Sequence, residues 1–263
     1  MNIRRLASLG LLAVAGTVLA TGCNTQPVPA GAGGTASAAP SASAPAAKDV
    51  LARAVAGLGT AKYALTITIG PQKATGTVDG PAHSAQINLT ATAEGITFTY
   101  DAVAVGSDVW VRLDLGAATN RQLGIAPARW MHVDVAKVTK PDALPLNVAS
   151  ADLLGIGGIT QAFAGLVRTD ATHLTGTVDL TRITGQLAPS ADDLAKVKDK
   201  VGAVPVAVTL DAQGRLTELK IDAAAIDPAL THDLTFNYDA PHPITKPTGA
   251  VEAPAKVYAF LNA

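Results

Sequence analysis

Few residues in this chain have the types and spacing that chemistry requires. The acidic residues are dispersed, and no Gly-x-Ser-x-Gly, Walker or His-Glu-x-x-His motif occurs. No two of the five histidines stand four residues apart; they are His83, His132, His173, His232 and His242. The sequence therefore predicts a protein that is not an enzyme, with no catalytic residue, no cofactor and no metal site.

The single cysteine, Cys23, is the exception. Arg4 and Arg5 precede an apolar run over residues 6–20, which has the length of a signal-peptide core and is too short for a comfortable membrane span. The run ends in Leu-Ala-Thr-Gly-Cys, which resembles the bacterial lipobox, where the cysteine sulfur is diacylated. We expect a lipoprotein signal peptide over residues 1–22 and lipidation at Cys23. The alternative is an ordinary signal peptide with a chance cysteine.

Residues 23–47 combine the lipidated cysteine with a flexible tether. After Cys23, 21 of the 24 residues to position 47 are Ala, Gly, Ser, Thr or Pro, a composition that cannot bury enough apolar surface to fold. Two acyl chains hold a protein on a membrane far better than one. The expected location is the extracytoplasmic face of the cell membrane. The chain carries 20 Lys+Arg against 21 Asp+Glu, which argues against a nucleic-acid partner.

The folded body is expected over residues 48–247. A helix is predicted over 49–57, where apolar residues share one stripe and glycines follow. The period then changes to two, with turn residues between short runs, which predicts an antiparallel meander. The expected class is α+β, with about ten strands and three helices. The predicted strands cover residues 63–69, 74–78, 85–91, 96–100, 109–113, 130–135, 172–180, 204–210, 216–221 and 234–238.

Three further segments carry open alternatives. An apolar helix over 153–166 is expected to be either a plug or a mobile lid, although three glycines weaken it. A shorter helix over 190–201 begins with a capping box at Ser190 and Asp193. Residues 248–263 form a C-terminal tail that is either loose or docked. Trp110 and Trp130 fit either a ligand rim or sheet packing.

A scarcity of bulky residues is the first indication of function. Only 4% of the chain is aromatic and 24 residues are glycine, so an apolar shell of this composition is suited to leaving a cavity. The alternative is that the helices fill the concave face of the sheet completely. Alternation alone selects the candidate lipid-binding residues that line the cavity: Leu65, Ile67, Ile87, Leu89, Phe98, Val109, Val111, Leu153, Ile156, Ile159, Phe163, Val208, Ile221 and Phe236.

The pattern resembles a known family. A lipobox and a Ser/Ala/Pro tether lead into a helix and a meander. Later come TGTVDL at 175–180, VPVAVTL at 204–210, GRL at 214–216, LTFNYD at 234–239 and the ending PITKP at 243–247. Over residues 48–247 the chain looks like the LppX/LprG-type lipoproteins of mycobacteria and other actinobacteria. The architecture also resembles that of the LolA/LolB lipoprotein carriers.

The resemblance implies a curved antiparallel half-barrel with helices packed on its concave face. An apolar cavity between them would hold the acyl chains of lipids or glycolipids, for transfer or presentation in the cell envelope. An acylated lipid or glycolipid is the expected partner, and a membrane transporter is a further candidate. The alternative function is a tethered, non-enzymatic interaction module that docks a transporter or sensor without a lipid ligand.

The anchoring prediction has a direct test. Because Cys23 supplies the only thiol, a Cys23→Ala chain is expected to lose incorporation of labelled palmitate and to leave the membrane fraction. The measurement is metabolic labelling followed by fractionation, with the unchanged chain as control. Equal palmitate label in the two chains would contradict acylation at Cys23.

Overall fold

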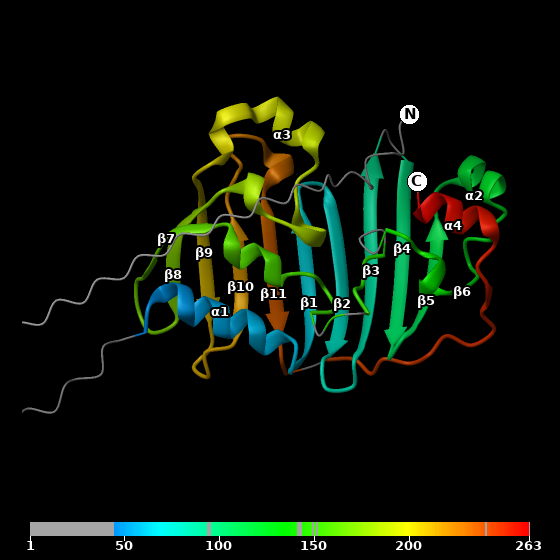
Figure 1. Ribbon diagram of the computed structural model, residues 1–263, viewed down its shortest axis with the longest axis horizontal. Helices are drawn as coiled ribbons and strands as arrows, with labels where there is room; N and C mark the ends of the chain where they lie inside the picture. Colours follow the sequence, from blue (N-terminus) through cyan, green and yellow to red (C-terminus); the bar gives the residue numbers. More distant parts are fainter. Residues whose placement is uncertain are drawn as a thin grey trace, which may run out of the picture. The chain divides into compact units, whose positions relative to one another are not determined.

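The computed structural model describes residues 45–93, 96–140, 144–148, 150, 152–239 and 241–262. These residues form a curved, unclosed sheet of twelve strands with four α-helices (Figure 1). The α+β class is confirmed, with twelve strands instead of about ten and four helices instead of three. The predicted signal peptide, Cys23 and the tether up to residue 44 lie outside the described residues.

The bounds of the elements follow the predicted strands closely at the start of the body. The helices are α1 (Ala47–Leu58), α2 (Ala117–Leu123), α3 (Ala191–Val197) and α4 (Ala255–Leu261). The strands are β1 (Lys62–Ile69), β2 (Gln72–Asp79), β3 (Ser84–Ala93), β4 (Ile96–Val105), β5 (Asp108–Asp114), β6 (Met131–Val133), β7 (Phe163–Arg168), β8 (His173–Val178), β9 (Val204–Leu210), β10 (Leu216–Ile221), β11 (His232–Asn237) and β12 (Val251–Glu252).

The sheet consists of two antiparallel meanders joined at β1 and β11. The strand order is β12-β6-β5-β4-β3-β2-β1-β11-β10-β9-β8-β7, and every neighbouring pair is antiparallel except β12 with β6. The pairing of β1 with β11 brings together segments that are far apart in the sequence and lie side by side in Figure 1. This long-range pairing makes one continuous sheet out of two local ones.

The two faces of the sheet differ sharply in composition. Successive side chains of a strand point to opposite faces. The inner face carries Leu65, Ile87 and Phe236, which are all buried. The opposite, outer face carries polar residues such as Thr66, which lies opposite Thr75 on β2. The inner face therefore holds the core, and the outer face is more polar, although Val103 and Trp110 on it are also buried.

Helix α1 and the chain before β7 cover the inner face. Leu51, Val55 and Leu58 of α1 are buried, and the helix contacts β7 and β10 as it crosses the second meander (Figure 1). In the chain between β6 and β7, Leu144 and Leu146 are also buried. The apolar stripe that predicted α1 is thus the surface by which it packs on the sheet.

The predicted helix over residues 153–166 is wrong. Gly155 has a φ of +64°, and the Asp152 carboxylate accepts the N–H groups of Ile156 (3.1 Å) and Gly157 (2.6 Å), which ends any α-helical ladder there. A 3₁₀ helix, η4 (Gly157–Gln161), follows, and Phe163 then opens β7. The apolar run is therefore an irregular cover that continues into an edge strand.

The segment after residue 247 is docked, which decides between the two expectations for the tail. Strand β12 pairs parallel with β6, and the Ala253 N–H donates to the His132 carbonyl at 2.9 Å. Val257 and Leu261 of α4 are buried in the common core. The folded body consequently extends past the expected boundary at 247.

The expected N-terminal contact of α3 between Ser190 and Asp193 is present, with one of the two backbone bonds of a capping box. The Ser190 hydroxyl accepts the N–H of Asp193 at 3.1 Å and donates to its carboxylate at 2.6 Å. The helix runs only to Val197, after which the chain tightens into a 3₁₀ turn up to Val201. The short helix thus begins where the sequence predicts and loses its α geometry earlier.

Gly76 gives a test of how closely the inner face is packed. A Cβ at Gly76 would overlap the Gln86 carbonyl oxygen and lie 2.7 Å from Ile87 Cδ1, whereas one at Gly57 on α1 meets nothing within 4 Å. We expect Gly76→Ala to lower the free energy of unfolding by about 1–3 kcal/mol. The same change at Gly57 should raise it by about 0.5–1 kcal/mol. Urea unfolding of both variants measures this, and equal effects would contradict the register of β2 with β3.

Candidate functional site

One row of side chains crosses the inner face from β1 to β5. Ile67 lies opposite Ala74, Ala74 opposite Leu89, Leu89 opposite Tyr100, and Tyr100 opposite Leu113. Neighbouring strands lie about 4.8 Å apart, so this row spans roughly 19 Å. We call it the Tyr100 row. Its only polar atom on a side chain is the Tyr100 hydroxyl oxygen.

Within this row Ile67, Leu89 and Tyr100 are half-buried, whereas Ala74 and Leu113 are buried. The next row toward one end holds buried residues: Leu65, Ile87, Ala102 and Val111, with Gly76 half-buried between them. Toward the other end the inner-face side chains become half-buried. We call this half-buried set the apolar rim; it comprises Ile67, Ile69, Leu89, Phe98 and Tyr100. The rim is where the apolar face of the sheet reaches the surface.

Small residues occupy the inner face of β2, β3 and β4. They are Ala74, Gly76, Ala85, Ala91, Ala102 and Ala104. Ala85, Ala102 and Ala104 are buried in the common core, and Ala74 is also buried, whereas Gly76 and Ala91 are half-buried. Small side chains therefore continue from the core to the half-buried part of the inner face.

The structure places the fourteen predicted lining residues in two groups. Three are half-buried and belong to the apolar rim: Ile67, Leu89 and Phe98. Eleven are buried in one hydrophobic core: Leu65, Ile87, Val109, Val111, Leu153, Ile156, Ile159, Phe163, Val208, Ile221 and Phe236. Of these eleven, Leu153, Ile156 and Ile159 lie on the cover, and Phe163 opens β7. Alternation therefore selected the correct face, and only part of that face is accessible.

Polar contacts hold the cover to the sheet and to its neighbouring loop. The Gln186 side-chain amide donates to the Leu144 carbonyl at 2.7 Å. His83 Nε2 lies 2.9 Å from the Val148 carbonyl oxygen. His83 itself has a φ of +45° in the turn between β2 and β3, an uncommon conformation for a residue other than glycine. Both contacts hold the first part of the cover, at Leu144 and Val148.

Tyr100 combines a half-buried ring with a buried hydroxyl that has no hydrogen-bond partner among the described residues. The hydroxyl oxygen is inaccessible although the residue as a whole is partly exposed, so the hydroxyl lies on the buried side of the residue. Burial raises the pKa of this hydroxyl well above its ordinary value, so it stays neutral. An unpaired buried hydroxyl destabilises a fold by about 1–3 kcal/mol. Such a group therefore needs an explanation.

Two other tyrosines satisfy their hydroxyls. Tyr238 donates to the Leu216 carbonyl at 2.8 Å, and Tyr258 accepts the Asp134 N–H at 2.9 Å. Thr231 also has a buried hydroxyl without a partner among the described residues. It lies in the turn before β11 and outside the Tyr100 row. Tyr100 is therefore the unsatisfied group that the candidate site contains.

His232 is a second polar residue on the inner face, opposite Ile69 and Ile221. Its Nδ1 lies 2.8 Å from the Leu230 carbonyl oxygen and its Nε2 3.0 Å from that of Leu187. Both carbonyls favour the protonated ring, yet burial is the larger effect and lowers the pKa of His232. The imidazole is thus held neutral beside the rim.

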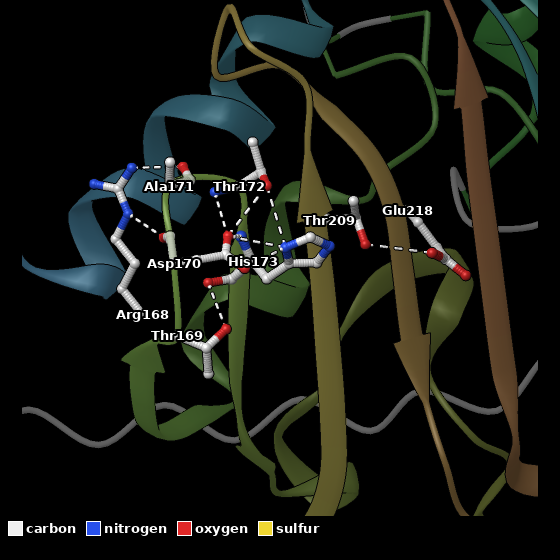
Figure 2. Close-up of polar contacts among 8 residues, drawn as sticks. All are labelled: Arg168, Thr169, Asp170, Ala171, Thr172, His173, Thr209 and Glu218. Atoms are coloured by element: carbon white, nitrogen blue, oxygen red, sulfur yellow. Dashed lines mark hydrogen bonds and ion pairs between the residues drawn. The ribbon is translucent and has the colours of Figure 1, made fainter.

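A cluster in the turn between β7 and β8 brings a hydroxyl, an imidazole and a carboxylate together (Figure 2). The Thr172 hydroxyl and the Asp170 carboxylate both contact Nδ1 of His173, at 3.1 and 2.8 Å. A catalytic relay needs the hydroxyl and the carboxylate on different ring nitrogens. The Asp170 carboxylate also accepts the Thr172 N–H at 2.7 Å, and these bonds lower its pKa to about 2. The cluster builds the turn and does not have the geometry of a relay.

The two tryptophans lie on the outer side of the sheet. Trp110 is 8% exposed and packs against His132, with ring centroids 5.5 Å apart. Its burial favours sheet packing over a ligand rim. Trp130 is half-buried beneath the Arg112 guanidinium, 4.8 Å from the ring centroid. Trp130 lines an open depression of about 500 Å³ with Ala126, Ala128, Arg129, Thr248 and Gly249. This depression is separate from the apolar rim.

The comparisons with known proteins give no match: no family model fits the chain, and no curated protein is significantly similar to it. Within the described part of the chain, none of the helices has both the length and the apolar character needed to cross a bilayer.

The predicted lining residues did not include Ile69, Ala74 and Leu113, nor the two polar residues Tyr100 and His232. The alternation of Phe98 and Tyr100 on β4 places Tyr100 on the inner face, which was a usable signal. Nothing in the sequence indicates that its hydroxyl is buried without a partner. His232 likewise precedes the alternating run that predicted β11, and only the register reveals its position opposite Ile69.

His232 predicts an acid-sensitive fold. The folded state disfavours protonation, so the unfolded chain binds the extra proton below its own pKa of about 6.5. Stability should therefore be greatest above that pH and fall as the pH drops toward 5. A His232→Gln variant should show a smaller fall over the same interval. Urea unfolding at stepped pH measures both slopes, and parallel slopes would contradict a neutral buried imidazole.

Proposed function

We propose that this protein is an extracytoplasmic lipoprotein, anchored through Cys23, that binds acylated lipids or glycolipids at the apolar rim and along the Tyr100 row. Its role is to transfer or present these lipids in the cell envelope. Membership of the LppX/LprG-type lipoproteins is part of this proposal. No catalytic step is involved.

The observation that supports the proposal most directly is the apolar rim. Five half-buried side chains, four of them hydrocarbon, stand beside a strip of alanine and glycine on a face that continues into the core. Contact between water and this apolar surface is unfavourable. A hydrocarbon chain lying along the row removes that contact.

The magnitudes fit an acyl chain. Burial contributes about 0.8 kcal/mol per methylene, so a dozen methylenes contribute about 10 kcal/mol before the costs of association. Those costs are about 4–15 kcal/mol. One chain therefore gives weak binding at best, and two or more chains give useful affinity. This arithmetic favours diacylated or more highly acylated lipids over free fatty acids.

The interaction-module alternative lacks a matching surface in the described residues. The large apolar side chains exposed there are Val167, at 55%, and Val251, at 38%. Val167 lies on β7 and Val251 on β12, the two opposite edges of the sheet. They do not form one contiguous patch, which is the usual mark of a docking surface.

Native mass spectrometry tests the proposal. The mature chain, residues 23–263 with Cys23→Ala, is purified from its own host and then mixed with a diacylated glycolipid. We expect a co-purified lipid mass or a gain of one lipid on mixing. Leu89→Trp should reduce that gain at least tenfold, because the larger side chain fills the Tyr100 row.

Thr90→Trp is the matched control, since Thr90 is the next residue on β3 and is exposed on the outer face. It should bind as the unchanged chain does. Thermal melting of both variants checks that they fold. Absence of any lipid mass in the unchanged chain would refute lipid binding, and equal binding by the two tryptophan variants would place the ligand elsewhere.

A further inference from the structure

The Tyr100 hydroxyl is the feature of the inner face that packing alone does not explain. It sits midway between Leu89 and Leu113 on the Tyr100 row, is inaccessible to solvent and has no partner among the described residues. Tyr238 and Tyr258 show that this fold does satisfy other tyrosine hydroxyls. A buried donor that the protein leaves free is suited to an acceptor brought by a ligand.

We propose that the Tyr100 hydroxyl donates a hydrogen bond to the carbonyl oxygen of an acyl ester or amide, at the point where a bound acyl chain joins its head group. The inference rests on the proposed lipid-binding function and names the ligand chemistry. The protein thereby recognises acyl-linked lipids in preference to hydrocarbons or alkyl ethers of the same length.

The chemistry of the surroundings selects a neutral acceptor. The other rim residues, Ile67, Ile69, Leu89 and Phe98, are hydrocarbon and offer no charge. The nearest ionic group on β4, Asp101, faces the outer side, where it pairs with Arg112 at 2.7 Å. A phosphate or carboxylate would need charged or multiple donors, which the rim lacks. An ester carbonyl needs only one neutral donor.

The position of Tyr100 at the rim also supports an ester carbonyl as the acceptor. The ring of Tyr100 is half-buried at the rim, while the next row beyond it, with Ile87 and Ala102, is buried. A ligand with its acyl chain along the apolar face and its head group in water has its ester at the boundary between the two. The residue Tyr100 lies at that boundary, and its neutral hydroxyl lies beneath the surface, so rim side chains must move aside for the ester carbonyl of a bound lipid to reach it.

The test compares two lipids that differ only in the carbonyl groups that join the two hydrocarbon chains to glycerol. Dipalmitoylglycerol and the dihexadecyl ether of glycerol are titrated by native mass spectrometry into residues 23–263 carrying Cys23→Ala. The chain should bind the ester about three- to tenfold more tightly than the ether, the contribution of one buried hydrogen bond. Tyr100→Phe should abolish this preference and leave affinity for the ether unchanged.

The melting temperature is a second measurement. Tyr100→Phe is expected to keep or raise it, although the same change abolishes the preference for the ester. Tyr100→Phe removes an unpaired buried hydroxyl, so the melting temperature of the lipid-free protein should stay level or rise. Tyr238→Phe is the control: it removes the 2.8 Å bond to Leu216, so it should lower the melting temperature and keep the preference for the ester.

The outcomes separate the two proposals. Failure of the unchanged chain to bind either lipid refutes the proposed function. Binding of both lipids with equal affinity, or an ester preference that survives Tyr100→Phe, refutes the role of the hydroxyl while lipid binding stands. A fall in melting temperature for Tyr100→Phe also refutes it, because the hydroxyl would then already have a partner in the free protein.

Discussion

The register between β1 and its two neighbours is the constraint on which the rest of the structure depends. Leu65 lies opposite Phe236 on β11 and opposite Gly76 on β2. A shift of one residue in either pairing would turn the apolar side chains of half the sheet toward water. Because both pairings hold, two local meanders share one inner face and one core. The apolar rim exists only because that shared face is longer than the segments that cover it.

Much of the sheet could be predicted because apolar and polar residues alternate strongly along its strands. The runs that became β3, β5 and β9 each place apolar residues at every second position. The predictions of secondary structure fail where specific interactions override the pattern of apolar residues. The Asp152 carboxylate and Gly155 break the expected helix over 153–166. The glycines were a visible weakness in the sequence, whereas the contacts of the Asp152 carboxylate were not. Strand β12 is two residues long and exists only through its partner β6, so no local pattern reveals it.

The candidate site was only partly predictable for a related reason. Alternation tells which face a side chain occupies, and it selected Ile67, Leu89 and Phe98 correctly as inner-face residues. Exposure depends on what lies above that face, which is decided by distant segments such as α1 and the chain around Leu144. The unsatisfied hydroxyl of Tyr100 and the Leu187 carbonyl beside His232 are likewise products of long-range packing. Sequence reasoning therefore locates the face and misses its polar groups.

The two edges of the sheet differ from its interior in a way that affects neighbouring copies of the protein. At one edge β12 offers two residues, and at the other β7 is interrupted by a register shift around Gly165, whose φ is +57°. A long flat edge strand invites another chain to extend the sheet, whereas a short or bulged one does not. Molecules held by acyl anchors in one membrane plane meet far more often than molecules in solution. If the chain is anchored through Cys23 as proposed, edges of this kind keep the crowded molecules from polymerising.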